Sequence, residues 1–182
     1  MPSPRRPKPL DAQGLMDYAL QALSSRSLTT GELRTRLQKR AAQPEEVAPV
    51  LGRLRDAGYL NDRRFAESFT RLRVEDQGFG KFRVLRDLRG RRVAPELAEQ
   101  TVAAAYRDLD ETQLIDRYLR RKLRLSEAGP AISDPRRLAS LYRQLLRAGF
   151  TAGKILEALR RLPAPAEWVE ELEEVAEDKD AG

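Results

Sequence analysis

The 182-residue sequence contains no cysteine and no histidine. Without cysteine there is no disulfide, iron–sulfur cluster or thiolate zinc site, and a reducing cytoplasm is the natural compartment. Without histidine the chain lacks the commonest metal ligand and the side chain that most readily moves protons near neutral pH. Carboxylate, lysine and tyrosine chemistry remain, but no distinctive constellation of these residues stands out. We therefore expect a protein that is not an enzyme and that needs no cofactor or metal.

Long apolar runs are missing and aromatic residues are few. No stretch of about 18 apolar residues occurs, so we expect a soluble chain that does not span a membrane. Aromatic residues make up 6% of the sequence, too few for the base-stacking platform of a single-strand binder. Affinity for single- or double-stranded DNA would therefore depend mainly on phosphate contacts, which are sensitive to salt and independent of base sequence.

Charge is distributed unevenly along the chain. Residues 164–182 hold eight acidic residues and one lysine, which leaves 33 basic and 20 acidic residues, net +13, in the remainder. Arginine is in excess, and its planar guanidinium group binds phosphate and carboxylate in a bidentate way. This basic body suggests an anionic partner, while a solvated helical surface without a partner is the alternative.

Apolar residues recur at three- and four-residue spacings from Leu15 onward, a pattern that predicts an all-α fold. We expect a first helix over residues 11–25 and a second over residues 32–40, capped by Thr29 or Thr30. A third helix follows and ends near a glycine.

The same three-helix pattern returns twice. When residues 33–54 are laid on 84–105 and on 141–162, apolar residues coincide, and Pro44 falls on Pro95. We interpret this as three tandem three-helix modules that form an elongated, curved array, with a single helical bundle as the alternative.

The repeat and the charge distribution together predict five parts of the chain. In the last part, Trp168 begins an acidic amphipathic helix that we expect to dock onto the body. The parts are a flexible basic arm at 1–10, three-helix modules at 11–61, 62–109 and 110–163, and an acidic C-terminal tail at 164–182.

Basic residues concentrate on the second helix of each predicted module. Arg83, Arg86 and Arg89 are spaced three residues apart and can share one helix face. Three stacked second helices would present a continuous basic strip, although a solvated face remains the alternative for any single arginine. The candidate partner- and DNA-binding residues are Arg34, Lys39, Arg40, Lys81, Arg83, Arg86, Arg89, Arg91, Arg92, Arg136, Arg137, Arg143 and Arg147.

Two glycines, Gly78 and Gly80, stand just before Lys81 and suggest a phosphate-binding loop. The spacing excludes it, because Phe82 follows Lys81 where serine or threonine is needed and no strand precedes the glycines. We interpret the segment as a corner between two helices.

Ordered motifs run through the middle of the chain: Gly58-Tyr59-Leu60-Asn61-Asp62, Phe65-Ala66, Arg73, Gly78-Phe79-Gly80, Arg83-Val84, Asp87-Leu88 and Arg91-Arg92-Val93. This pattern resembles the central module of the RecX family, and the resemblance extends more weakly over residues 15–162. Lys81 stands where the family commonly has proline and Arg92 where it commonly has glycine, which puts the local turn in doubt.

RecX-like proteins are built from three-helix repeats and restrain the RecA recombinase by lying along the groove of its filament on DNA. The resemblance implies the same function here: a cytoplasmic, monomeric negative regulator that suppresses ATP hydrolysis and strand exchange in DNA repair, homologous recombination and the SOS response. A general sequence-independent DNA-binding protein is the main alternative, and an enzyme using glutamate or lysine is a weaker one. In a further hypothesis, the acidic tail folds over the basic strip and holds the protein off its partner.

Overall fold

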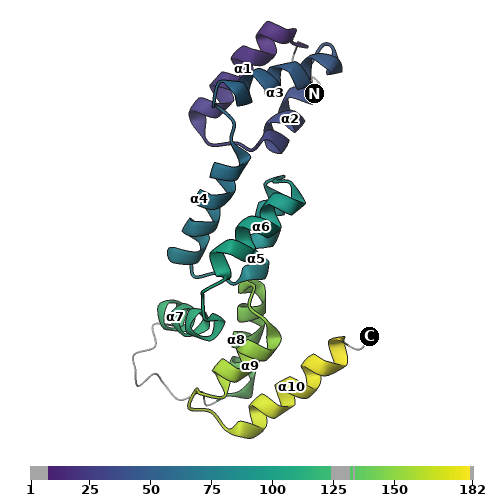
Figure 1. Ribbon diagram of the computed structural model, residues 1–182. Helices are drawn as coiled ribbons and strands as arrows, with labels where there is room; N and C mark the ends of the chain where they lie inside the picture. The colour runs from purple at the N-terminus through teal and green to yellow at the C-terminus, as the bar shows by residue number, and fades with distance from the viewer. Residues whose placement is uncertain (1–7, 124–131, 133, 181–182) are drawn as a thin grey trace, which may run out of the picture. The chain divides into compact units, whose positions relative to one another are not determined.

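The predicted all-α fold is confirmed. The structure, a computed structural model, describes residues 8–123, 132 and 134–180, and every regular element within them is a helix. Of the predicted basic arm, residues 1–7 lie outside the described residues. In chain order the elements are α1 (Ala12–Ser25), α2 (Thr30–Gln38), η1 (Pro44–Glu46), α3 (Val47–Asp56), α4 (Asp62–Glu75), α5 (Lys81–Gly90), α6 (Pro95–Tyr106), α7 (Glu111–Leu123), α8 (Pro135–Ala148), α9 (Ala152–Leu159) and α10 (Ala166–Asp180) (Figure 1).

Capping side chains explain where the first helices begin. The Asp11 carboxylate accepts the N–H of Gly14 at the start of α1. At the start of α2, the Thr29 hydroxyl accepts the N–H of Glu32 while the Glu32 carboxylate accepts the N–H of Thr29. This reciprocal capping box starts α2 two residues before the expected position, so the start predicted at residue 32 is wrong.

Pro44 and Gly58 mark helix boundaries as expected, and Gly149 marks a further one. Pro44 begins a 3₁₀ turn that leads into α3. Proline has no backbone N–H, and the N–H groups of a first helical turn lack a partner within the helix in any case. Gly58 follows α3 with φ of +77°, and Gly149 ends α8 with φ of +92°. Both are left-handed conformations, which glycine adopts without the steric cost of a Cβ atom.

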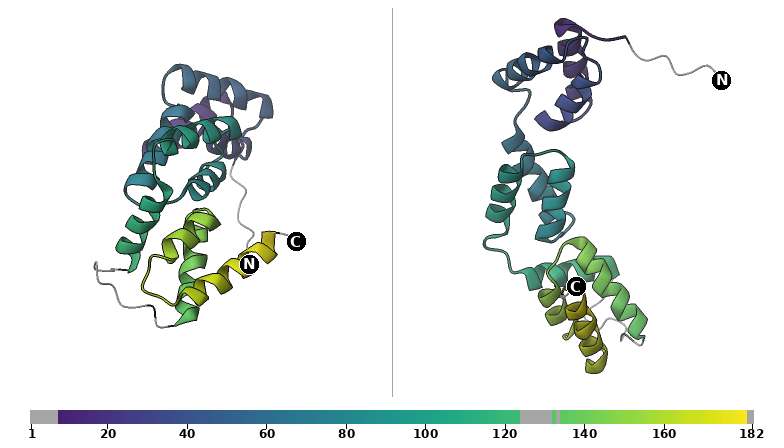
Figure 2. Two further views of the ribbon diagram at one scale, coloured as in Figure 1. Left: turned by 60° about the horizontal axis from the view of Figure 1, so that its bottom comes forward. Right: turned by 90° about the vertical axis from the view of Figure 1, so that its right-hand side faces the viewer.

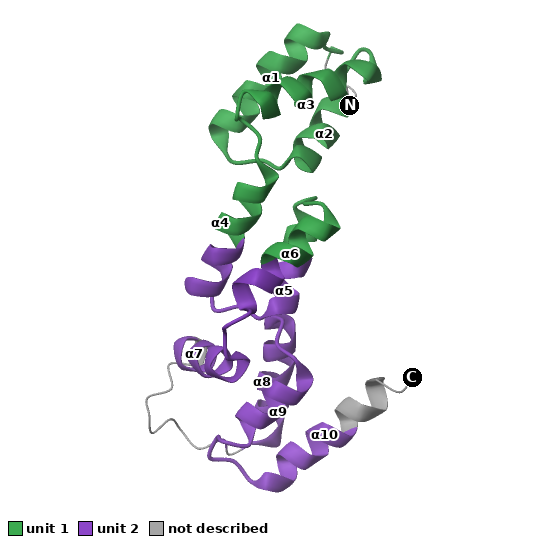
Figure 3. Cartoon of the chain, in the orientation of Figure 1, with its two compact units in different colours: residues 1–69, 88–101 green, residues 70–87, 102–182 purple. Residues whose placement is uncertain are grey.

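The chain divides into two compact units (Figure 3). Unit 1 contains Met1–Phe69 and Leu88–Thr101, and unit 2 contains Thr70–Asp87 and Val102–Gly182. The boundaries between the two units cut through α4, α5 and α6, so the units differ from the predicted modules. Each predicted module range contains three α-helices.

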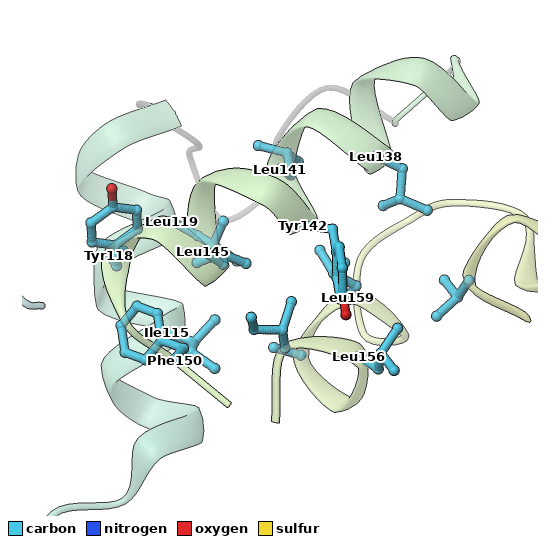
Figure 4. Close-up of a cluster of buried hydrophobic side chains, with 14 of the residues drawn as sticks. Ile115, Tyr118, Leu119, Leu138, Leu141, Tyr142, Leu145, Phe150, Leu156 and Leu159 are labelled. Atoms are coloured by element: carbon cyan, nitrogen blue, oxygen red, sulfur yellow. The ribbon is translucent and has the colours of Figure 1, made fainter. Parts of the chain in front are cut away.

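Each unit has its own apolar core. In unit 1 the core lies between α1, α2 and α3 and is centred on fully buried leucines: Leu15, Leu33, Leu37, Leu51 and Leu54. In unit 2 the core lies between α7, α8 and α9, where Tyr118 meets Phe150 edge to face at 5.8 Å between ring centroids (Figure 4). Burial of these side chains is the main stabilising contribution in both units.

The acidic tail contains α10, which lies beside α8 and α9 (Figures 1 and 2). Val169 is buried in the core of unit 2, and Trp168 packs against the same core, so the predicted docking of Trp168 is confirmed. An ion pair between Arg160 and Glu173 also joins the tail helix to the end of α9. The proposed covering of the basic strip by this tail stays a prediction.

Candidate partner-binding surface

In unit 1 the C-terminal end of α5 meets the N-terminal end of α2, and we call this contact the first joint. The Thr29 hydroxyl donates a hydrogen bond to the Arg91 carbonyl oxygen at 2.6 Å. A Cβ atom on Gly31 would lie 2.5 Å from the Arg92 carbonyl oxygen, so only glycine allows the backbones to approach this closely. The Arg91 carbonyl, just beyond the end of α5, thus finds its partner at the N-cap of α2.

An ion pair closes the first joint. The Arg91 guanidinium donates to both carboxylate oxygens of Glu32, at 2.8 and 3.1 Å, and also donates to the Ser27 carbonyl. It lies 4.8 Å from the centroid of the Phe65 ring. Burial raises the pKa of the Glu32 carboxyl, but hydrogen bonds from Arg91 and the Thr29 N–H, with the charges of Arg91 and Arg26, outweigh burial and lower that pKa.

In unit 2 the N-terminal end of α5 meets the C-terminal end of α8, which we call the second joint. The Gly80 N–H donates to the Ala148 carbonyl at 2.8 Å, and the Phe82 N–H donates to the Gly149 carbonyl at 3.1 Å. A Cβ atom on Gly80 or on Gly149 would meet backbone atoms of the other segment well below 3.0 Å. The predicted corner glycine Gly80 therefore serves a close contact between two backbones.

Two of the leading candidate residues help to close the second joint. Arg83 and Arg86 each donate from a guanidinium nitrogen to the Arg147 carbonyl at 3.4 Å, where the last turn of α8 leaves carbonyls without helical partners. Arg83 also pairs with Asp87 at 3.0 Å and lies over the Phe79 ring. Arg83 is thus held inside unit 2, whereas the Arg86 side chain remains exposed.

The two departures from the family pattern both lie at the ends of α5. Lys81 is the first residue of α5, where a proline would also fit. Arg92 has φ of +57° and is the one non-glycine residue with positive φ in the described part of the chain. The left-handed turn that glycine would adopt easily therefore forms here with an arginine, at some cost in strain.

The other candidate residues lie mostly on the surface. Arg89 forms an exposed ion pair with Glu99 at 2.8 Å, and the Arg40 guanidinium lies 5.0 Å from the Tyr18 ring centroid. Within residues 8–123, 132 and 134–180, eight candidate residues have exposed side chains that bind no other group of the protein. They are Arg34, Lys39, Lys81, Arg92, Arg136, Arg137, Arg143 and Arg147. These eight cations, from α2, from both ends of α5 and from α8, are available to an anionic partner.

Sequence reasoning overlooked the acidic partners. Asp87 is the sole acid of α5 and stands four residues after Arg83, a spacing that already signals an ion pair on a helix. Glu32 and Arg91 are 59 residues apart, and no local spacing signals their pairing. Among the described side chains no group of acidic residues could hold a metal ion, and none of the described helices is long and apolar enough to cross a bilayer.

Comparison with known proteins gives a consistent family match. Residues 16–54 match the model of the first three-helix domain of RecX, and residues 61–102 match its second three-helix domain. The chain is 37% identical over 166 residues to the Regulatory protein RecX of Deinococcus radiodurans, covering 88% of this chain and 75% of that protein. It is 34% identical over 148 residues to the Regulatory protein RecX of Halorhodospira halophila, covering 81% and 87% of the two chains.

The fold also matches a solved structure. The crystal structure of RecX from Lactobacillus salivarius superposes with a TM-score of 0.62 at 19% identity, covering 83% of this chain and 96% of that chain. At this level of identity the match concerns the fold, which is the repeated three-helix fold that the sequence predicts.

Proposed function

This chain belongs to the RecX family, and on that premise we propose that it is a negative regulator of the RecA recombinase. In this proposal the protein acts in the cytoplasm as a monomer, binds the groove of the RecA–DNA filament, and inhibits ATP hydrolysis and strand exchange without catalysing a reaction itself. The observation that carries the proposal is the 37% identity over 166 residues to a protein named Regulatory protein RecX.

The exposed cations support this proposal. Outside the acidic tail the chain carries a net charge of +13, and α2 and α8 each present basic side chains without partners in the described structure. A nucleoprotein filament offers both phosphates and acidic side chains, to which guanidinium groups bind well. Contacts to single- and double-stranded DNA would then add to contacts with the recombinase.

The direct test is the single-stranded-DNA-dependent ATPase of RecA from the same organism. The protein is added at substoichiometric and stoichiometric ratios while DNA is kept in excess. Strong suppression at low ratios is expected, because one regulator bound in a filament groove affects many RecA subunits. DNA in excess prevents simple competition for DNA from producing the same result.

A matched pair of variants locates the surface. Four exposed cations are neutralised together in the test variant: Arg34→Gln in α2, Lys39→Gln directly after α2, and Arg136→Gln and Arg137→Gln in α8. Four exposed cations of α3 and α4 are neutralised in the control, Arg53→Gln, Arg55→Gln, Arg63→Gln and Arg64→Gln. Inhibition should be lost in the test variant and kept in the control, since both lose the same charge. Equal inhibition by both variants would contradict the assignment of binding to these cations.

A general DNA-binding protein is the second candidate, and the net charge of the body favours it. It predicts tight binding to DNA without RecA, with a steep dependence on salt. An unchanged RecA ATPase together with such binding would replace the regulator proposal with this one.

A further inference from the structure

Two large apolar side chains lie exposed beside the second joint. Phe82, near the start of α5, is 56% exposed, and Leu146, in the last turn of α8, is 41% exposed. Their backbones are joined through one residue, because the Phe82 N–H donates to the Gly149 carbonyl and the Gly149 N–H donates to the Leu146 carbonyl. The two side chains therefore stand on neighbouring turns of unit 2.

The joint itself does not require these two side chains. The repeat alignment, extended a few residues towards the N-terminus, places Phe82 on Gly31 and Leu146 on Arg89, which flank the first joint. The first joint is therefore closed without an apolar side chain at either place. The exposed phenylalanine and leucine side chains are thus an addition to the second joint. Exposed apolar surface that is rimmed by polar residues is typical of interaction sites.

Cations surround the two apolar side chains. Lys81 precedes Phe82, and Arg86 follows it by one helical turn and donates to the Arg147 carbonyl. On α8, Arg143 and Arg147 lie one turn and one residue from Leu146. All four basic side chains are exposed, while α8 contains no acid and the one acid of α5, Asp87, is paired with Arg83.

We propose that Phe82 and Leu146 with this cationic rim form a docking site for an acidic segment of a protein partner that carries an apolar anchor. Aromatic and arginine side chains dominate the binding energy of protein interfaces, and carboxylates pair with arginine in a bidentate way. A nucleic acid fits less well, because one phenylalanine beside an aliphatic side chain offers a single base-stacking surface. The site rests on the proposed function, in which the partner is the RecA of the filament.

The experiment measures binding to RecA filaments assembled on immobilised single-stranded DNA. The test variant carries Phe82→Ala and Leu146→Ala, and the matched control carries Tyr59→Ala and Leu72→Ala, whose side chains are 61% and 51% exposed. The Kd of the test variant should rise about tenfold or more, as expected for loss of a hydrophobic anchor, while the control stays near the wild type. Circular dichroism and thermal unfolding check that both variants are folded.

Binding of each protein to the same oligonucleotide without RecA completes the design. The proposal expects no difference between wild type and test variant on bare DNA. An equal loss of affinity on bare DNA would overturn it in favour of a nucleic-acid surface, and wild-type affinity of the test variant for the filament would also overturn it. If the wild-type protein itself fails to bind RecA filaments, the proposed function falls and this site falls with it.

Discussion

The first and second joints occupy the same place in the repeat, yet different chemistry holds them. The repeat alignment places Thr29 on Gly80 and Arg91 on Ala148. In unit 1 a threonine hydroxyl donates to the carbonyl that ends the neighbouring second helix, and in unit 2 a backbone N–H donates to the equivalent carbonyl. Among the described residues, the first joint adds an ion pair between its two helices, Arg91 with Glu32, whereas the Arg83–Asp87 pair beside the second joint lies within α5. The repeat therefore preserves the position of the contact and not the groups that make it.

The carbonyl at the end of the second helix of the first module is also hydrogen-bonded. Arg40 is aligned with Arg91, and its carbonyl accepts the N–H of Leu10 at 2.7 Å. The last residue of the predicted basic arm thus takes the place that an adjoining helix takes in the two joints. Because the last carbonyls of a helix have no partners within the helix, each second helix needs a donor from elsewhere in the chain. Any segment with a donor at the right place satisfies that need.

The largest expected loss of stability comes from a substitution that creates a steric clash in the second joint. In Gly149→Ala the new Cβ atom would meet the Arg83 backbone, and the residue would also keep φ of +92°. We expect a loss of about 3 kcal/mol in the free energy of unfolding, measured by urea denaturation. The control is Gly153→Ala in the same unit, where no atom lies within 4 Å of the new Cβ atom. Equal stability of the two variants would contradict this account of the joint.

Removing the ion pair of the first joint should also destabilise the protein. Arg91→Ala leaves the largely buried Glu32 carboxylate without its main partner and removes the cation from the Phe65 ring. We expect a loss of about 2 kcal/mol in the free energy of unfolding. Arg89→Ala, which breaks an exposed ion pair two residues away, is the control and should cost about 0.5 kcal/mol or less. The structural assignment is wrong if both variants lose the same amount.

Acid should weaken the first joint. The pKa of Glu32 in the folded protein lies below its ordinary value of 4.5. The carboxylate therefore contributes stability above that value, and this contribution is lost as the pH falls through the folded pKa. Glu32→Gln removes the titrating group, so the difference in unfolding free energy between wild type and variant should shrink as the solution is acidified. A difference that does not depend on pH would show that the charge of Glu32 is unimportant.

The smallest expected change in stability concerns the residue with positive φ in each joint. Arg92 has φ of +57°, and the repeat places it on Gly149. Arg92→Gly should stabilise the protein by about 1 kcal/mol, because glycine relieves the left-handed strain. The greater freedom of glycine in the unfolded chain partly offsets this gain. Arg92→Ala serves as the control and should show no gain, since alanine keeps the strain. Thermal unfolding of the three proteins measures the effect.

Local chemistry accounts for what could be predicted. Three- and four-residue apolar spacing indicated the helices, and the threonines at 29 and 30, Pro44 and Gly58 lie where helices begin or end. The limits of local reasoning appear at Ala42, which the repeat aligns with the buried Val93 and Phe150 but which is exposed. An apolar residue type at a repeat position does not guarantee burial, because its neighbours decide how much of it is covered.

By itself, the sequence determined that this protein is all-helical, that it repeats a three-helix pattern, that its body is basic, and that it resembles the RecX family. Only the tertiary structure decided which cations are free. Arg83 and Arg91 look as available in the sequence as Arg136 or Arg143, yet the first two are held by groups in their own units. Helix periodicity is a property of neighbouring residues, whereas the partners of Arg91 and of the Arg147 carbonyl lie about 60 residues away along the chain and meet them only after folding.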